Sequence, residues 1–238
     1  MTKPGYVRSA IAPSLAGAPG GPPPGGPSPE PAIVLQADAI RKAYRRGWRR
    51  TESPVLLGAD LSIRAGEIVG LVGENGAGKS TLMKILVGSL EGDSGRVSIS
   101  GTFGYCPQEP LLYERLTPDE HFELFGEAYG LDRPTIDENR DQLYDIFNFE
   151  RYRDMRVEEL SGGTRAKLNL GIALIHDPDV LLLDEPYAGF DWDTYLRFWN
   201  LAAERRDAGR AVLIISHFVA DEERFDRIIH LRDGKTVG

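Results

Sequence analysis

Three short apolar runs have the length and composition of strands that are buried on both faces of a sheet. They are IVGLV at 68–72, VLLLD at 180–184 and AVLII at 211–215. Such runs are typical of parallel strands in an α/β fold, where helices cover both faces of the sheet. Glycines or polar side chains follow each run, and ligands bind at the carboxyl ends of the strands in such folds. The pattern therefore predicts a site at one edge of the sheet.

Other stretches have the periodicity of amphipathic elements. Residues 32–40 and 53–64 alternate like strands with one exposed face, which predicts an antiparallel β part near the N-terminus. Residues 109–160 have helical spacing, and the first helix there opens with a capping box from Thr117 to Glu120.

Two further local patterns predict a helix and a hairpin. Leu82, Ile85, Leu86 and Leu90 share one face of a helix that follows a glycine-rich loop. Near the end of the sequence, RIIHLRDGKTV predicts two antiparallel strands joined by an Asp-Gly turn.

The first 31 residues differ in composition from the rest. They contain nine of the 16 prolines and six of the 27 glycines, with few charges. Such a segment cannot form a helix or a packed strand, so we expect a disordered tail over 1–31, followed by one globular domain over 32–238. The tail can be an inert extension or a tether for a partner.

Composition narrows the class of protein. The chain has 238 residues, a net charge of −8 and one cysteine, Cys106. The negative charge argues against nucleic acid as a main partner, because binding a phosphate backbone needs a basic face. A single cysteine permits no disulfide within the chain and favours a reducing compartment. No apolar run approaches the ~18 residues that cross a bilayer, so we expect a cytoplasmic chain.

The stretch GENGAGKS at 73–80 matches the phosphate-loop pattern G-x-x-x-x-G-K-[ST] in full. The loop's backbone N–H groups would face phosphate oxygens, Lys79 would bring a positive charge to the β- and γ-phosphates, and the Ser80 hydroxyl would ligate Mg²⁺. A purely structural turn is the alternative reading, but a buried strand before the loop and a helix after it disfavour that reading. The predicted nucleotide-binding residues of this segment are Gly73, Glu74, Asn75, Gly76, Ala77, Gly78, Lys79, Ser80 and Thr81.

Four polar side chains are expected near this loop. Asp184, at the end of a buried strand, would hold Mg²⁺, and Glu185 would orient or deprotonate the attacking water as general base. His217 follows another buried strand and can hydrogen-bond the γ-phosphate and steady Glu185. Gln108 can reach Mg²⁺ or the attacking water with its amide oxygen; an ordinary polar loop residue is the alternative.

The stretch RKAYRRGWRR at 41–50 combines six basic residues with two aromatic ones. Tyr44 could stack on an adenine base. The arginines are open to three readings: a solvated loop, contact with nucleotide phosphates, or contact with anionic lipid headgroups.

A second glycine-rich helix start lies in LSGGTRAKL at 160–168. Backbone N–H groups at such a start suit an anion, although the chain already has one complete phosphate loop. With this segment, the set of motifs resembles the nucleotide-binding subunits of ABC transporters over about 32–238. The motifs that carry the resemblance, in the family's order, are Walker A at 73–80, the Q-loop at Gln108, the signature LSGG at 160–163, Walker B ending at Asp184, the catalytic Glu185, the D-loop at Asp191 and the H-loop at His217.

The resemblance implies a fold, an activity and partners. The fold is an α/β P-loop NTPase core with an N-terminal antiparallel β subdomain and an inserted α-helical subdomain at about 109–160. Two cassettes, expected to be identical, pair head to tail with ATP between them, and each signature contacts the γ-phosphate held by the other. A transmembrane permease, as a separate chain, would hold the cassette on the inner face of the cell membrane. The Q-loop and the helical subdomain would pass closure of the pair to this permease, with Tyr113, Phe122 and Phe125 as candidate residues.

The resemblance also assigns roles to residues. Catalysis would use Glu185, His217, Lys79 and Gln108, and Mg²⁺ would be held by Ser80, Gln108 and Asp184. The residues expected to contact ATP beyond the phosphate loop are Tyr44, Gln108, Ser161, Gly162, Gly163, Asp191 and His217. Two positions depart from the family pattern, because Thr164 stands where glutamine is usual and Phe190 where leucine is more usual.

The leading hypothesis is an ATP-hydrolysing motor subunit of a membrane exporter. A soluble ABC ATPase acting on nucleic acid or ribosomes is the alternative, which the single cassette, the lack of heptads and the single cysteine disfavour. A P-loop kinase or GTPase is a third reading, which the signature and the absence of an Asn-Lys-x-Asp string disfavour.

Overall fold

The computed structural model of the chain describes residues 6–11, 31–46, 51–216 and 219–237. Its helices and strands, with three short 3₁₀ helices marked η, are β1 (Tyr6–Ile11), β2 (Ile33–Arg46), β3 (Thr51–Arg64), β4 (Ile68–Val72), α1 (Lys79–Leu86), β5 (Ser94–Ser100), β6 (Phe103–Cys106), α2 (Pro118–Ala128), α3 (Arg133–Phe147), η1 (Glu150–Tyr152), η2 (Val157–Glu159), α4 (Gly162–Leu174), β7 (Val180–Asp184), α5 (Trp192–Asp207), β8 (Ala211–Ile215), η3 (Val219–Arg224), β9 (Arg227–Arg232) and β10 (Lys235–Val237).

A six-stranded sheet, in the order β10-β9-β4-β8-β7-β6, forms the centre of the protein. Neighbouring strands are parallel except for β9 and β10. Val69 and Leu71 of β4 pack in the same core as α1, whereas Ile68 packs in the core of α4 and α5. Because both faces of the sheet are covered, successive positions must be apolar, which explains the continuous apolar runs in the sequence.

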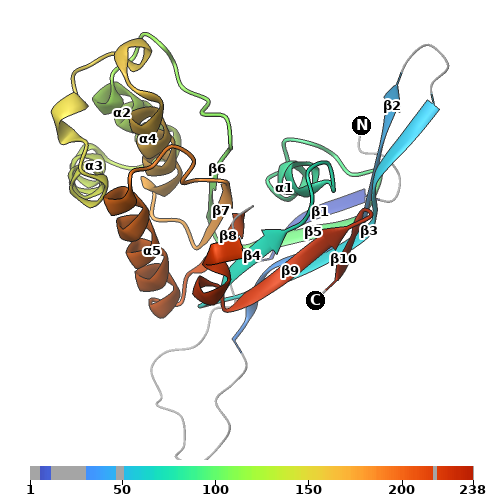
Figure 1. Cartoon of the computed structure of the whole chain (residues 1–238). Coiled ribbons are helices and arrows are strands. Elements are labelled where there is room, and N and C mark those ends of the chain that lie inside the picture. The colour runs from blue at the N-terminus through green and yellow to red at the C-terminus, as the bar shows by residue number, and fades with distance from the viewer. Residues whose placement is uncertain (1–5, 12–30, 47–50, 217–218, 238) are drawn as a thin grey trace, which may run out of the picture.

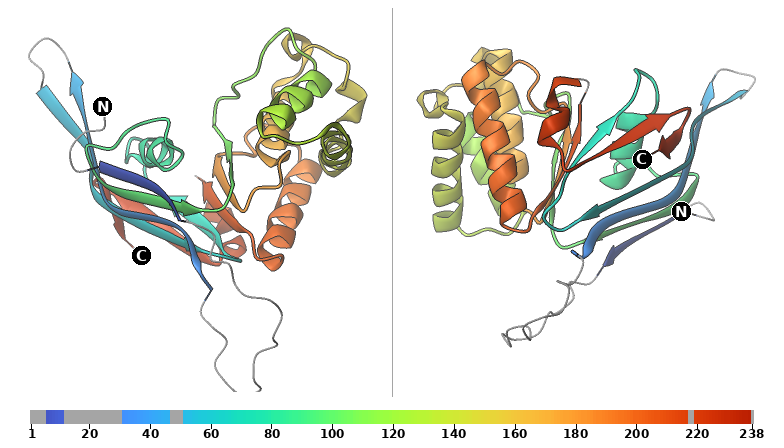
Figure 2. Two further views of the ribbon diagram at one scale, coloured as in Figure 1. Left: turned by 180° about the vertical axis from the view of Figure 1, so that it is seen from behind. Right: turned by 60° about the horizontal axis from the view of Figure 1, so that its bottom comes forward.

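A second sheet, in the order β1-β5-β2-β3, covers the α1 side. Strands β2, β3 and β5 are antiparallel, as predicted for the N-terminal β part. Figures 1 and 2 show this sheet and α1 on one side of the molecule and the helices α2 to α5 gathered on the other. The predicted α/β fold with a β part and an inserted helical part is confirmed.

The predicted disordered tail over 1–31 is wrong for Tyr6–Ile11. These six residues form β1, which pairs with β5 in parallel, with Tyr6 opposite Gly95. The Tyr6 ring is buried against Gly92, where an added Cβ would lie 2.9 Å from it. The prolines and glycines of the surrounding segment obscured a strand-forming stretch that lacks both residue types. The rest of the predicted tail, apart from Pro31, lies outside the described residues.

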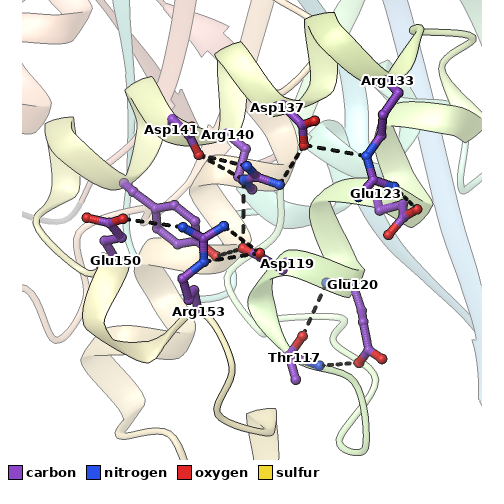
Figure 3. A network of polar contacts seen from close by, with 11 residues as sticks. Thr117, Asp119, Glu120, Glu123, Arg133, Asp137, Arg140, Asp141, Glu150 and Arg153 are labelled. Carbon is purple, nitrogen blue, oxygen red and sulfur yellow. Dashed lines mark hydrogen bonds and ion pairs between the residues drawn. The ribbon is translucent and has the colours of Figure 1, made fainter.

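The helical part is held together by a buried cluster and by polar contacts. The capping box predicted at Thr117 is present, with Glu120 donating its N–H to the Thr117 hydroxyl and accepting the Thr117 N–H. Asp119 accepts hydrogen bonds from the Tyr144 hydroxyl (2.7 Å) and the Arg153 guanidinium (2.8 Å), as part of the network in Figure 3. This network ties α2 to α3 and to the segment after η1, so these elements form one unit.

Two local predictions differ in outcome. The hairpin of β9 and β10 is confirmed, with positive φ at both Asp233 (47°) and Gly234 (71°), as a two-residue turn of this kind requires. The first helix is shorter than its apolar spacing predicted, because α1 ends at Leu86 and Gly88 follows with a φ of 79°. Leu90 therefore packs against the core from beyond the helix.

Within the described ranges, no helix is long and apolar enough to span a bilayer.

Candidate active site

The phosphate-loop residues connect β4 to the N-terminus of α1, and their geometry requires glycine at two positions. Gly78 precedes the helix with a φ of 107°, and a Cβ there would lie 3.0 Å from side-chain atoms of Val55 and Leu56. A Cβ on Gly73 would lie 2.3 Å from the carbonyl oxygen of Leu231. Because the residue before the helix has no side chain that could cap it, the first N–H groups of α1 are available to an anion.

Lys79 is the first residue of α1 and is buried. Its Nζ donates to the carbonyl oxygens of Gly73 (2.6 Å) and Glu74 (3.1 Å). Burial lowers the pKa of Lys79, while the nearby carboxylates of Glu185 and Asp184 oppose this shift. The ammonium group is thus held at the loop by two neutral acceptors, and phosphate oxygens would be stronger, charged acceptors for the same donor.

Asp184 ends β7 and is only 3% exposed. Burial raises the pKa of its carboxyl group, and a hydrogen bond with the Ser80 side chain opposes the shift. The Oδ1 atom is buried and has no hydrogen-bond partner among the described residues. A buried carboxylate oxygen without a partner is costly unless a cation binds it, and Mg²⁺ takes oxygen ligands of this kind. The chemistry of Asp184 and Ser80 therefore fits a magnesium site; the role of Gln108 as a third ligand stays a prediction.

Glu185 and Gln108 come together from adjacent strands. Strands β6 and β7 are parallel, with Cys106 opposite Leu183, so the residues that follow them meet at the same edge of the sheet. The Gln108 amide nitrogen donates to Glu185 Oε2 at 3.2 Å. Sequence reasoning gave the Gln108 amide oxygen a role toward Mg²⁺ or water; the structure adds this direct contact with the predicted general base.

His217, a predicted catalytic residue, lies outside the described residues. The strand before it, β8, pairs with β7 so that Ile215 lies opposite Asp184. Ser216, which follows, is buried and accepts a hydrogen bond of 2.6 Å from the Tyr187 hydroxyl.

Tyr44 lies near the end of β2 and is 38% exposed. Its hydroxyl is 3.5 Å from the Thr81 hydroxyl of α1, so the ring lies beside the helix that follows the phosphate loop. The ammonium group of Lys42 lies 5.9 Å from the ring centroid and donates to the Glu91 carbonyl oxygen at 2.6 Å. Lys42 is therefore a residue that steadies the ring and that sequence reasoning left without a specific role. Arg49 and Arg50 lie outside the described residues.

The signature segment forms the start of α4, away from the phosphate loop of the same chain. Ser161 is the N-cap residue, and its hydroxyl is 2.9 Å from the hydroxyl of Thr164. Ser161 and Gly162 are exposed, and an added Cβ on Gly162 would meet nothing within 4 Å. Figures 1 and 2 show α4 among the helices α2, α3 and α5, whereas α1 lies against the sheets. The structure therefore does not bring the predicted signature residues together with Lys79 and Asp184.

The predicted D-loop residue, Asp191, is the N-cap of α5 and accepts a hydrogen bond of 2.8 Å from the Thr194 N–H. It also forms an ion pair with Lys167 of α4, at 3.5 Å. An added Cβ on Gly163 would lie only 2.7 Å from the carbonyl oxygen of Gly189. The start of α4 and the loop before α5 are thus packed together as one piece.

A cavity of about 840 Å³ borders the phosphate loop on the side of the β9–β10 hairpin. The loop residues Gly73–Ala77 line it together with Val55, His230 and Asp233. Glu185 and Asp184 are not among its lining residues, so the cavity and the carboxylate cluster lie on different parts of the loop. Sequence reasoning gave His230 no role and did not find that the hairpin faces this loop.

Two residues of α4, Lys167 and Asn169, make contacts that sequence reasoning missed. Lys167 pairs with Asp191, and Asn169 is buried and bonded to the residues before Gln108. The available signal was a polar residue inside the otherwise apolar run LNLGIAL, because a buried polar side chain in a helix needs a partner on another element.

Comparisons with known proteins show the family of this chain. A family model described as "ABC transporter" matches residues 56–188. The chain is 32% identical over 187 residues to an uncharacterized ABC transporter ATP-binding protein of Methanocaldococcus jannaschii, covering 78% of this chain and 71% of that protein. It is 31% identical over 227 residues to a Nod factor export ATP-binding protein I of Ralstonia nicotianae, covering 90% and 69% of the two chains.

A solved structure gives the same result for the fold. The structure of an ATP-binding subunit of an ABC transporter superposes with a TM-score of 0.78 at 27% identity, covering 86% of this chain and 88% of that one. The residues matched by the family model, 56–188, include the phosphate loop and strand β7, which ends at Asp184. The chain therefore belongs to the ABC transporter family, as an ATP-binding subunit that hydrolyses ATP.

Proposed function

We propose that the protein is the ATP-hydrolysing motor of a membrane exporter and acts on a separate transmembrane permease. The observation that carries the proposal is the cluster at one edge of the six-stranded sheet, where Lys79, Asp184 and the Glu185–Gln108 pair meet beside the phosphate loop. The direction of transport is inferred from the Ralstonia relative, whose name describes export.

Within this cluster we assign roles to residues. Lys79 would leave the loop carbonyls and bind the β- and γ-phosphates, and Ser80 and Asp184 would hold Mg²⁺. The metal ion, when bound, would neutralise charge on the phosphate oxygens. Glu185 would accept a proton from the attacking water, while the Gln108 amide donates a hydrogen bond to Oε2 of the same carboxylate. His217 keeps its predicted role at the γ-phosphate on the basis of its position after β8.

The second glycine-rich helix start would serve the ATP of another copy of the chain. The phosphate loop of the same chain precedes α1 and lies apart from α4, while Ser161 and Gly162 are exposed and open to an incoming ligand. A head-to-tail pair would place the signature of each copy on the nucleotide of the other, with Asp191 along the seam. ATP would then join the two copies, and its hydrolysis would loosen them.

The helical part would contact the permease. Leu111 and Tyr113 are exposed by 75% and 58%, and both lie in the segment after Gln108. Phe122 is buried in the core of the helical part, so it would pass motion to the permease through packing and not by direct contact.

A size measurement tests the head-to-tail pair. Glu185→Gln should bind ATP·Mg²⁺ without hydrolysing it and should elute as a dimer, because the γ-phosphate bridge persists. Adding Ser161→Arg should restore the monomer, because the bulky cation would occupy the space of the partner's phosphate. Adding Ser89→Arg, at an exposed serine beyond the far end of α1, is the matched control and should leave the dimer intact.

The outcomes separate the alternatives. If Glu185→Gln binds ATP and remains a monomer, the head-to-tail pair of identical chains is wrong. Co-purification of the tagged full chain should then be examined. A polytopic membrane protein would support a heteromeric transporter, and ribosomes or nucleic acid would support the non-transport alternative.

A further inference from the structure

Asn169 joins the signature helix to the root of the loop that carries Gln108. It lies in α4, eight residues after Ser161, and is 7% exposed. Its Nδ2 donates to the carbonyl oxygen of Pro107 at 2.9 Å and to the Cys106 sulfur at 3.2 Å. Cys106 is the last residue of β6 and is buried, so the contact lies inside the protein, where hydrogen bonds are strongest.

The bonded segment leads directly to the catalytic cluster. Gln108 follows Pro107, and its amide donates to Glu185 Oε2 at 3.2 Å. Pro107 links Cys106, the last residue of β6, to Gln108. Its carbonyl group belongs to the peptide bond with Gln108, so a shift of this carbonyl also shifts the backbone nitrogen of Gln108. The exposed Gln108 side chain has the Glu185 carboxylate as a hydrogen-bond partner.

We propose that Asn169 is a positioning residue, which sets the place of Gln108 against Glu185 and makes that place depend on the signature helix. The inference rests on the roles proposed above for Gln108 and Glu185. It goes beyond them because α4 begins at the signature, which would serve the partner's nucleotide. A displacement of α4 by the partner's ATP would reach this chain's own general base through two hydrogen bonds, Asn169 to Pro107 and Gln108 to Glu185.

The test is the steady-state ATPase activity of the full-length chain carrying Asn169→Leu. Leucine has a similar size but cannot donate, so the Pro107 carbonyl loses this partner and the loop root is released. We expect kcat to fall about tenfold, with the KM for ATP within twofold of the original. Lys79, Ser80 and the phosphate loop are untouched by the change, and for this reason nucleotide binding should be preserved.

Asn139→Leu is the matched control. Asn139 of α3 also donates its amide to a backbone carbonyl, that of Ile175 just beyond the end of α4, at 2.8 Å. Removal of this bond loosens α4 at the end opposite the signature and leaves the bond between Asn169 and Pro107 in place, so it should lower the melting temperature without lowering kcat by more than twofold. An equal fall in kcat for both variants would overturn the proposal, because it would reflect general loosening of α4.

A double variant tests the route through Gln108. If Asn169 acts through Gln108, then Asn169→Leu should cost little further activity in a Gln108→Ala background. A further tenfold loss in that background would overturn the proposal while leaving the role of Gln108 intact. If Gln108→Ala alone leaves kcat unchanged, the proposed role of Gln108 fails, and the inference about Asn169 fails with it.

Discussion

At the scale of single residues, Glu185 has a backbone conformation that is unusual for its type. Its φ is 52°, in the left-handed region that residues with a Cβ seldom adopt. Its N–H donates to the Ile215 carbonyl of the neighbouring strand at 3.1 Å, and its carbonyl accepts the Ala188 N–H at 3.2 Å. These two bonds hold the conformation, which costs about 1–3 kcal/mol and places the carboxylate beside Gln108.

We therefore predict that Glu185→Gly is more stable than Glu185→Gln by about 1 kcal/mol, because glycine adopts positive φ without strain. Both variants lack the general base and should be inactive, so activity cannot explain a difference between them. The measurement is the free energy of unfolding in urea. Equal stability, or a less stable glycine variant, would show that the backbone at this position is not strained.

The residues of the site differ in how far the sequence could predict them. Asp184 and Ser80 follow from local motifs, since each lies at a fixed place relative to a strand end or a helix start. Asn169 could not be predicted as a positioning residue, because its bonds depend on how α4 packs on β6, two elements separated by more than 50 residues. The contact between the Thr164 and Ser161 hydroxyls is of the local kind, because the two residues lie three positions apart at the start of α4.

At the scale of elements, β1 is a strand that the composition of the segment 1–31 led us to miss. Its side chains do more than complete a sheet, because the Tyr6 hydroxyl lies 3.5 Å from the carbonyl oxygen of Ile85 and the Arg8 guanidinium donates to that of Leu86. Both carbonyls belong to the last turn of α1, beyond the regular bonds of the helix, and that of Ile85 also accepts the Gly88 N–H at 3.1 Å. A cation at this end also complements the helix dipole. The strand therefore stabilises the helix that begins at the phosphate loop.

We expect Tyr6→Ala to lower the free energy of unfolding by about 3 kcal/mol, since it removes a buried ring from the core. Val7→Ala is the control, because Val7 is 47% exposed on the same strand and its truncation should cost less than 1 kcal/mol. Thermal or urea unfolding of the two variants checks this. If Tyr6→Ala is as mild as Val7→Ala, the strand does not contribute to the core in solution.

The elements themselves were largely predictable, and the errors have local causes. Buried strands, the phosphate loop, the capping box and the hairpin depend on short-range rules. The end of α1 was misplaced because Leu90 keeps the apolar spacing even though Gly88 has already turned the chain. The pairing of β1 with β5 joins residues about 90 positions apart, which periodicity cannot reveal.

At the scale of the whole molecule, the buried His121 and the half-buried His176 make stability depend on pH. The Tyr113 N–H donates to His121 Nε2 at 2.9 Å, so this nitrogen is unprotonated and Nδ1 donates to the Thr117 carbonyl at 2.8 Å. Burial lowers the pKa of His121, and Glu120 opposes the shift. Burial also lowers the pKa of His176, assisted by Arg205 and opposed by Asp177.

Because both pKa values are lower in the folded state, the unfolded chain binds more protons as the pH falls below about 6.5. Their contribution to stability is complete above that pH and is lost progressively below it. We predict that a double variant, His121→Gln with His176→Gln, shows a shallower loss of unfolding free energy between pH 7 and pH 5. An unchanged slope would mean that other groups cause the acid sensitivity.

The position of β1 has a consequence for association between molecules. An unpaired strand at the edge of a sheet offers a row of N–H and C=O groups to any extended chain that approaches it. Here β5 would be such an edge, but six residues of the same chain already pair with it. The N-terminal strand thus covers β5 and takes its place as the edge of the sheet, so a chain that began at residue 32 would expose the backbone groups of β5 in place of those of β1.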